Sequence, residues 1–243
     1  MTSTRVALVT GGSGGIGGAV VQRLARDGFA VAIHYAGNPD RAERLATAVR
    51  TDGGAAITVG GDVADEAAMA AAFDAVAAEF GGIDVVINTA GIMLLSPIAT
   101  LDLADLDRMH RTNIRGAFVL AQLAAARLRA GGALINFSTS VTRAQFPSYA
   151  GYVASKAAVE GMTLILAREL RGRDITVNAV APGPTATPLF LDGKDEQTVD
   201  NLAKAAPLER LGTPDDIAEQ VAFLAGPARW VNGQVVYVNG GLV

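Results

Sequence analysis

The fold is decided by the stretch Val6-Ala7-Leu8-Val9-Thr10-Gly11-Gly12-Ser13-Gly14-Gly15-Ile16-Gly17. Its first four residues form a short apolar run, typical of a strand buried on both faces. A glycine loop and then a helical pattern, 16–27, follow, with Gly28 as the expected stop. Glycines let the backbone approach an anion, and a helix N-terminus presents free N–H groups and positive potential. The stretch therefore predicts a phosphate cradle, and its flanking strand and helix favour a dinucleotide over a turn that merely needs glycine.

The alternation of strand and helix repeats along the whole chain. Further strands are predicted at 31–34, 56–60, 85–88, 133–137, 175–180 and 234–238, and further helices at 41–52, 66–80, 106–129, 151–171 and 214–225. This pattern predicts an α/β protein with a doubly wound parallel sheet, a Rossmann fold, of about seven strands covered by helices on both faces. No linker interrupts the pattern, so residues 1–243 are expected to form a single domain.

Composition excludes several classes of function. Half of the residues are hydrophobic and 18% are charged, which indicates a well-buried globular protein. The net charge of −4 gives no basic footprint for nucleic acid. The chain has no cysteine for thiolate or disulfide chemistry, and its two histidines, His34 and His110, lack the spacing of metal ligands. No apolar run reaches membrane-spanning length, so we expect a soluble, cytoplasmic protein without metal.

The stretch Tyr152-Val153-Ala154-Ser155-Lys156 carries a candidate acid–base pair. Positions four apart share one face of a helix, so the polar ends of Tyr152 and Lys156 can converge. A phenol has a reference pKa of about 10, and a neighbouring ammonium lowers it, which would tune a general acid or base. A Tyr and a Lys at this spacing are more often surface decoration. However, Lys156 is one of only three lysines and is flanked by small residues, which favours a functional pair.

One irregular region follows the sixth predicted strand. Residues 182–208 hold four prolines and the apolar pair Phe190-Leu191, with a helical pattern at 196–205. A long insertion beyond the carboxyl end of a strand is where a substrate lid is expected. We place this lid at about 184–208.

Several motifs follow one another in order along the chain: Thr10-Gly11 through Gly17, Asn88-Thr89-Ala90-Gly91, Asn113, Ser138 to Ser140, Tyr152 with Lys156, Pro182-Gly183, and the tail from Asn232 to Gly241. Taken together, they resemble the motifs of the short-chain dehydrogenase/reductase family over essentially the whole chain. The chain looks most like the 3-oxoacyl-carrier-protein reductase and ketoreductase branch. The resemblance implies an NAD(P)-dependent oxidoreductase that interconverts a carbonyl and a secondary alcohol by hydride transfer. It also implies a homodimer or homotetramer.

The same resemblance implies roles for the catalytic residues. Tyr152 would exchange a proton with the carbonyl oxygen, and Lys156 would lower the phenol pKa and bind the nicotinamide ribose. Asn113 would hold a water that links the lysine to solvent, although an asparagine inside a helix can also make a local backbone bond. The family usually places an orienting serine thirteen residues before the tyrosine. That position is Thr139 here, whose hydroxyl can donate the same bond, and Ser140 remains the alternative.

The resemblance also implies a set of cofactor contacts. Asp62 would bond the adenine amino group, or it caps a helix. The motif at Asn88 departs from the family's double asparagine, because Thr89 replaces the second one. The full set implied for the cofactor is Gly11, Ser13, Gly15, Ile16, Gly17, Asp62, Val63, Asn88, Ala90, Gly91, Tyr152, Lys156, Pro182, Gly183 and Thr187.

Cofactor choice depends on the end of the second predicted strand. An acid there would bind the adenosine ribose and select NAD, but residues 34–38 contain none. The arginine or lysine that NADP-preferring relatives often carry is also missing, because Gly14 and Gly37 occupy its usual places. We predict that NADP(H) is preferred with modest discrimination and that NAD(H) is possible. The predicted phosphate contacts are Ser13, Tyr35 and Asn38.

Two other functions remain open from the sequence. A cofactor-sensing binding protein would keep the fold, but it has no need of Tyr152, Lys156 and a proton relay. An epimerase or lyase would use the cofactor only transiently, but such relatives generally carry longer C-terminal substrate regions. A carrier-protein partner would require a basic patch, for which Arg111, Arg115 and Arg143 are candidates unless they are ordinary solvated arginines.

Overall fold

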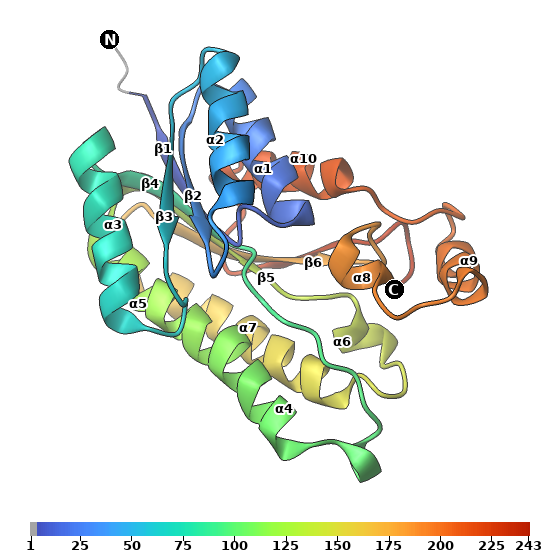
Figure 1. Ribbon diagram of the computed structural model, residues 1–243. Coiled ribbons are helices and arrows are strands. Elements are labelled where there is room, and N and C mark those ends of the chain that lie inside the picture. Colours follow the sequence, from blue (N-terminus) through green and yellow to red (C-terminus); the bar gives the residue numbers. More distant parts are fainter. Residues whose placement is uncertain (1–3) are drawn as a thin grey trace.

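The computed structural model describes residues 4–243, and its strands form one parallel sheet of seven strands in the order β3-β2-β1-β4-β5-β6-β7. The strands are β1 (Val6–Thr10), β2 (Ala30–Tyr35), β3 (Ala56–Gly60), β4 (Ile83–Asn88), β5 (Leu128–Phe137), β6 (Thr176–Pro182) and β7 (Val235–Val238). From β1 the chain runs to one edge and then returns to add β4 on the other side of β1 (Figure 1). This reversal places a topological switch point at the carboxyl ends of β1 and β4, where such sheets bind ligands.

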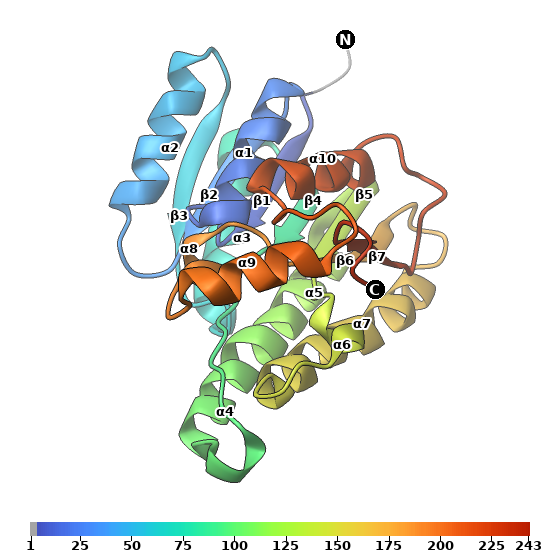
Figure 2. The ribbon, with the colours of Figure 1, turned by 90° about the vertical axis from the view of Figure 1, so that its right-hand side faces the viewer.

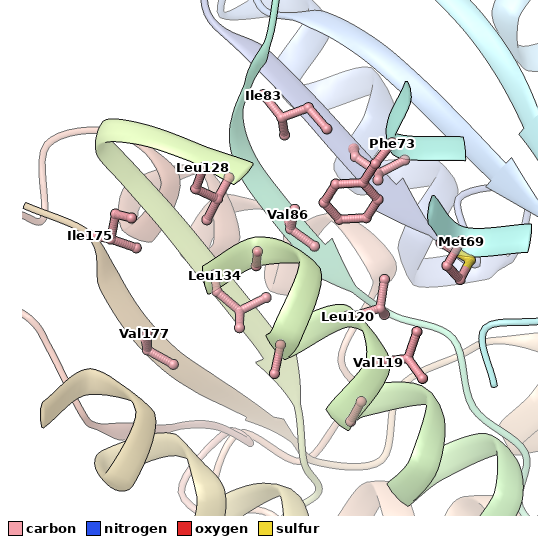
Figure 3. Close-up of a cluster of buried hydrophobic side chains, with 14 of the residues drawn as sticks. Met69, Phe73, Ile83, Val86, Val119, Leu120, Leu128, Leu134, Ile175 and Val177 are labelled. Atoms are coloured by element: carbon pink, nitrogen blue, oxygen red, sulfur yellow. The ribbon is translucent and has the colours of Figure 1, made fainter. Parts of the chain in front are cut away.

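Helices cover both faces of the sheet, as predicted (Figure 1). One face packs against α1 (Gly15–Arg26), α2 (Asp40–Thr51) and α10 (Pro214–Ala225). The other packs against α3 (Glu66–Phe80), α5 (Gly116–Arg127) and α7 (Ala150–Glu169). Figure 3 shows part of this second core, in which Phe73 and Leu120 meet the strand residue Val86. Each such side chain contributes roughly 1.5–3 kcal/mol by burial, so packing on both faces holds the sheet in place.

The helix predicted at 106–129 differs from the structure. It is divided into α4 (Leu103–Met109), a π-helical turn (His110–Arg115) and α5. The turn contains Asn113, whose buried side chain bonds the backbone of Ile92. A π turn shifts the register of the helix by one residue, which lets a side chain be directed inward, and such turns occur frequently at functional sites.

The connection after β6 carries two helices, α8 (Pro188–Leu191) and α9 (Glu196–Ala205). Figure 2 shows α9 lying across the front of the sheet, with α8 beside it. The bounds of α9 agree with the predicted helix, whereas α8 was not predicted. Two further short elements, η1 (Ile98–Thr100) and α6 (Val141–Ala144), are also too short to carry a helical repeat in the sequence.

Candidate active site

A cleft opens at the carboxyl ends of the central strands and holds about 850 Å³ of space, part of it open to solvent. The structure brings into its lining residues from several of the predicted motifs: Ile16, Gly91, Thr139, Tyr152, Lys156, Pro182, Gly183 and Thr187. Pro182 ends β6, and the amide of Gly183 donates to the carbonyl of Val238 at 2.9 Å. Three predicted catalytic residues, Thr139, Tyr152 and Lys156, therefore share one cavity with predicted nicotinamide-end residues, whereas Asn113 and Ser140 do not line it.

The glycine-rich loop forms a tight cradle at one end of this cleft. Gly11 has φ +64°, and its carbonyl accepts the amide of Gly14 at 2.9 Å. A Cβ on Gly17 would lie 2.3 Å from the Gly11 oxygen, and one on Gly15 would lie 2.9 Å from Cγ2 of Thr187. The Gly11 turn is backed by Ala90, since a Cβ on Gly11 would lie 3.0 Å from the Ala90 nitrogen. Only glycines fit these positions, and they leave room for an anion.

The first turn of α1 starts at this cradle without a side-chain cap. Gly14 is its N-cap residue and makes no side-chain hydrogen bond to the free N–H groups of the turn. These groups, together with the positive end of the helix dipole, suit a phosphate. The donor set of the loop therefore fits the pyrophosphate of a dinucleotide.

His34, at the end of β2, supports the cradle from behind and was missed as a functional residue. Its buried ring accepts the Gly11 amide on Nδ1 at 3.4 Å and lies 3.0 Å through Nε2 from the carbonyl of Gly61. Burial lowers its pKa to about 4, so the ring is neutral at pH 7, with its proton on Nε2 for Gly61. A histidine directly after the apolar run 30–33 was the only signal in the sequence.

Tyr152 and Lys156 lie one turn apart on α7, and the lysine Nζ is 5.8 Å from the centroid of the tyrosine ring. Lys156 is buried and donates to the carbonyl of Phe137 at 2.9 Å, and burial lowers its pKa to about 8. Burial also raises the pKa of Tyr152 above its usual value, with Tyr149 adding to the shift and a hydrogen bond to Thr139 opposing it. The sequence predicted a lowered pKa for the Tyr152 phenol, and this prediction is wrong. Burial raises the pKa, and the Lys156 ammonium is directed at the carbonyl of Phe137.

The two candidate orienting hydroxyls differ in where they point. Thr139 lines the cleft beside Tyr152, to which its side chain bonds, and its Oγ1 also accepts a long bond from the amide of Val141, at 3.3 Å. Ser140 does not line the cleft. Its Oγ donates to the carbonyl of Ala181 and accepts from the side chain of Asn239, each at 3.1 Å. The Thr139 hydroxyl is thus available to a ligand, whereas the Ser140 hydroxyl holds the strand ends together.

Asn113 joins the strand-end turn after β4 to α7. Its Oδ1 accepts from the amide of Ile92, and its Nδ2 donates to the carbonyl of Ile92 and to Oγ of Ser155, each at 2.9 Å. The Ser155 hydroxyl in turn donates to the carbonyl of Tyr152 at 2.7 Å. A Cβ on Gly91 would lie 3.2 Å from Asn113 Oδ1 and 3.3 Å from Lys156 Nζ. Asn113 therefore fixes the floor of the cleft beside both catalytic candidates.

Known proteins resemble this chain over nearly all of its length. A family model described as enoyl-(acyl carrier protein) reductase matches residues 11–243. An NADPH-dependent aldehyde reductase-like protein, chloroplastic, of Arabidopsis thaliana is 40% identical over 98% of this chain and 94% of its own. A 3-oxoacyl-[acyl-carrier-protein] reductase of Staphylococcus aureus is 38% identical over 100% of this chain and 99% of its own. A short-chain dehydrogenase of Burkholderia cenocepacia in complex with NADP superimposes with a TM-score of 0.92 at 38% identity, covering 99% and 98% of the two chains.

The chain belongs to the short-chain dehydrogenase/reductase family. It is an NAD(P)-dependent oxidoreductase with the Rossmann fold of that family. The resemblance found in the sequence is confirmed, including the presence of 3-oxoacyl-carrier-protein reductases among its relatives.

The residues predicted for the adenosine end of the dinucleotide lie outside the cleft lining. Val63 is buried against the position of Gly116, where a Cβ would lie 2.7 Å from Val63 Cγ2. The carboxylate of Asp62 accepts from the amide of Ala64 at 2.9 Å and from Arg111 at 2.8 Å, and these bonds lower its pKa. An adenine amino group at Asp62 would have to share this carboxylate with the guanidinium.

Two other residues predicted for this end are partly committed. The ring of Tyr35 leans over Gly60, whose Cβ would lie 2.9 Å from Tyr35 Cζ, and the Oδ1 atom of Asn38 accepts the amide of Asp40 at 2.8 Å. At the centre of the sheet, Asn88 accepts from the Thr10 hydroxyl at 2.9 Å. Asn88 therefore braces β1 and β4 at the switch point.

The arginines considered for a carrier-protein patch are engaged locally. Arg111 pairs with Asp62, and Arg115 pairs with Glu66 at 2.7 Å. Arg143 lies over the ring of Tyr237 at 4.5 Å. Within residues 4–243 no group of three or more His, Cys, Asp or Glu side chains is placed to hold a metal ion. In the same range no helix has the length and apolar character needed to cross a bilayer.

Proposed function

We propose that the protein is an NADP(H)-dependent oxidoreductase that interconverts a neutral, largely apolar carbonyl compound and its secondary alcohol. The observation that carries this proposal is the convergence of Tyr152, Lys156 and Thr139 in one cleft that begins at the uncapped N-terminus of α1. The NADP complex of the Burkholderia cenocepacia relative and the NADPH-dependent Arabidopsis thaliana relative support the choice of cofactor.

In the proposed reaction the bound nicotinamide supplies the hydride to the carbonyl carbon. Tyr152 donates its phenolic proton to the carbonyl oxygen, and the Thr139 hydroxyl donates a hydrogen bond to the same oxygen. Lys156 would act from the side, as a buried cation that would bind the nicotinamide ribose. Asn113 supports the cleft floor beneath Lys156 and would hold the water that links Lys156 to solvent. We assign the orienting role to Thr139 because the Ser140 hydroxyl is already bound by Ala181 and Asn239.

The pKa of Tyr152 supports reduction as the direction the site favours near neutral pH. Burial raises this pKa above its usual value, so the phenol stays protonated and can act as an acid. Oxidation of the alcohol requires the phenolate, which becomes available only as pH rises. We therefore expect reduction to proceed at neutral pH and oxidation to accelerate in alkali.

The substrate class follows from the lining of the cleft. Lys156 is the only charged residue that lines it among residues 4–243, and the outer walls are apolar or aromatic: Ile92, Met93, Val141, Phe146, Tyr149, Leu189, Phe190 and Leu202. The last three come from α8 and α9. We propose residues 184–208 as a substrate lid. A 3-oxoacyl thioester would place its acyl chain on these walls, but the paired Arg111 and Arg115 offer little free charge to an acidic carrier protein.

We also propose that the protein forms a homodimer or homotetramer in the cytoplasm. Phe118 on α5 and Leu164 and Ile165 on α7 are exposed apolar residues on the two helices expected to pack against their copies. Light scattering coupled to size-exclusion chromatography should give a dimeric or tetrameric mass, and Ile165→Glu should lower it. Fractionation of the native cell should recover the protein in the cytosolic fraction.

The test is NADPH oxidation, followed at the nicotinamide absorbance, over aldehydes, aryl and alkyl ketones, quinones, sugars and short 3-oxoacyl thioesters. We expect turnover on apolar aldehydes or ketones and little on sugars, with NADPH more efficient than NADH. Equal efficiency of the two cofactors would refute the NADP(H) preference. Tight cofactor binding without turnover of any compound would replace the enzyme with a cofactor sensor.

A further inference from the structure

A second groove lies behind the glycine cradle, between the first turns of α1 and α2. Its lining is Ser13, Gly14, Gly15, Gly18, Ala19, Gln22, Arg41, Arg44 and Leu45. α1 and α2 pack against each other here, and a Cβ on Gly18 would lie 3.9 Å from Cδ2 of Leu45, an ordinary van der Waals contact. Since Ser13 and Gly14 belong to the loop that starts α1, the groove continues the phosphate cradle toward the adenosine end.

The two arginines of this groove are exposed and uncommitted. Across residues 4–243, neither the Arg41 nor the Arg44 guanidinium takes part in an ion pair or a side-chain hydrogen bond. Of the two acids in the first turn of α2, Glu43 is bound by Arg50 at 2.5 Å and by the Thr58 hydroxyl at 3.2 Å, and Asp40 lies outside the lining of this groove, in a neighbouring groove that Arg44 also borders. The groove has no acid in its lining, so it carries a local excess of positive charge in a chain whose net charge is negative.

The spacing of these arginines explains how they reach the loop. Arg41 and Arg44 are three residues apart and therefore share one face of α2. Leu45, at the next position on that face, is partly buried against the core that contains α1. The face that carries the arginines is consequently turned toward Ser13 and Gly14. The sequence places glycine where a cation is expected in the loop, at Gly14, and α2 brings cations to the same place in space.

We propose that Arg41 and Arg44, together with the Ser13 hydroxyl, bind the 2′-phosphate of NADP(H) and are the residues that set the cofactor preference. A planar guanidinium matches a phosphate dianion through two parallel N–H···O bonds. NAD(H) lacks this phosphate and therefore gains no affinity from the two arginines. Tyr35 and Asn38, predicted for this role, do not line the groove. Arg44 also borders a neighbouring groove with Asp40.

This inference rests on the proposed function, and its test uses equilibrium binding so that the two can fail separately. NADPH and NADH are titrated by nicotinamide fluorescence into the wild-type protein, Arg41→Ala, Arg44→Ala and the double variant. Each single variant should weaken NADPH binding about tenfold and the double about a hundredfold, whereas NADH binding should change by less than about twofold. Arg171→Ala removes the same charge from the exposed turn after α7 and should change neither affinity.

A second binding experiment isolates the phosphate. Adenosine 2′,5′-bisphosphate and adenosine 5′-monophosphate are compared as competitors of NADPH, and only the bisphosphate should lose affinity in the Arg41→Ala protein. Unchanged NADPH affinity in the double variant, or an equal loss for NADPH and NADH, would overturn the assignment of the two arginines. Failure of the wild-type protein to bind either cofactor would instead overturn the proposed function.

Discussion

The floor of the cleft and the lid above it are built on different principles. The floor is made of buried polar groups whose hydrogen bonds are nearly all internal, as Asn113 and Lys156 show. The lid is made of short helices with exposed apolar residues: Leu189 is 52% exposed, and α9 has no buried residue. From this comparison we infer that the proposed reaction depends on the floor, whereas substrate choice depends on the proposed lid, a segment that can change without disturbing the core.

The largest effect on stability is expected when a polar residue of the cleft floor is removed. Asn113→Ala would leave the partly buried amide and carbonyl of Ile92 without side-chain partners and would remove the buried bond to Ser155. We expect a loss of about 4 kcal/mol in the free energy of unfolding, measured by urea denaturation. Asn201→Ala on the exposed lid helix is the matched control and should cost less than about 0.5 kcal/mol. Similar losses in both variants would show that floor and lid are equally constrained.

Acid should lower the stability of the protein through His34, the buried residue behind the glycine cradle. Its pKa is about 4 in the folded protein, against an unfolded reference near 6.5. The folded state thus binds fewer protons than the unfolded state between these values, so stability rises with pH across this window and is lost on acidification from 6.5 toward 4. We expect His34 to account for about 3 kcal/mol of that loss.

The measurement is urea unfolding at several pH values between 4 and 7. His34→Gln keeps one donor and one acceptor for Gly61 and Gly11 but does not titrate. This variant should show a flatter dependence than the wild type. Parallel curves for the two proteins would mean that His34 is not buried as a neutral ring.

Two adjacent hydroxyls sharpen the comparison within the floor itself. Thr139→Ala should lower kcat about a hundredfold, equivalent to about 2.7 kcal/mol in the barrier, without affecting stability. Ser140→Ala should leave kcat nearly unchanged but cost about 1 kcal/mol of stability, because it removes a bond to Ala181. Steady-state kinetics and thermal unfolding on both variants check this. The reverse pattern would transfer the orienting role to Ser140.

The smallest effect is expected in the lid. Phe190→Ala removes an aromatic wall of the cleft and should raise KM for an apolar carbonyl substrate about tenfold, equivalent to about 1.4 kcal/mol, with little change in kcat. The free energy of unfolding should change by less than about 1 kcal/mol, because the ring is only partly buried. A large drop in kcat, or a large loss in the free energy of unfolding, would mean that Phe190 takes part in catalysis or in the folded core and does not act only on substrate binding.

Much of the fold could be predicted because its signals are local. The bounds of β3, α3, α9 and α10 agree with the predicted segments. Their signals are local: apolar periodicity, the cap at Asp65 for α3, and the proline that starts α10 at Pro214. The π turn around Asn113 could not be predicted, because it depends on where Ile92 lies in the folded chain. The sequence of the short helix α8 is likewise too brief to show a period.

The site followed the same division. The cradle, Tyr152 and Lys156 carry motifs with fixed spacing, so their approach to one cleft was predictable. The choice between Thr139 and Ser140 was not, because neighbouring residues beyond the end of β5 point in different directions. Arg41 was invisible for a related reason: it lies 28 residues from Ser13 along the chain, and only the packing of α2 on α1 brings it near.

The central claim is that Tyr152 transfers the proton to the substrate, whereas cofactor binding does not depend on the Tyr152 hydroxyl. The most direct test measures NADPH affinity and single-turnover NADPH oxidation in wild type and Tyr152→Phe, with the best substrate from the panel. The account predicts an NADPH affinity within about twofold of wild type and a rate lower by about a thousandfold. A Tyr152→Phe protein that oxidises NADPH at the wild-type rate would contradict it.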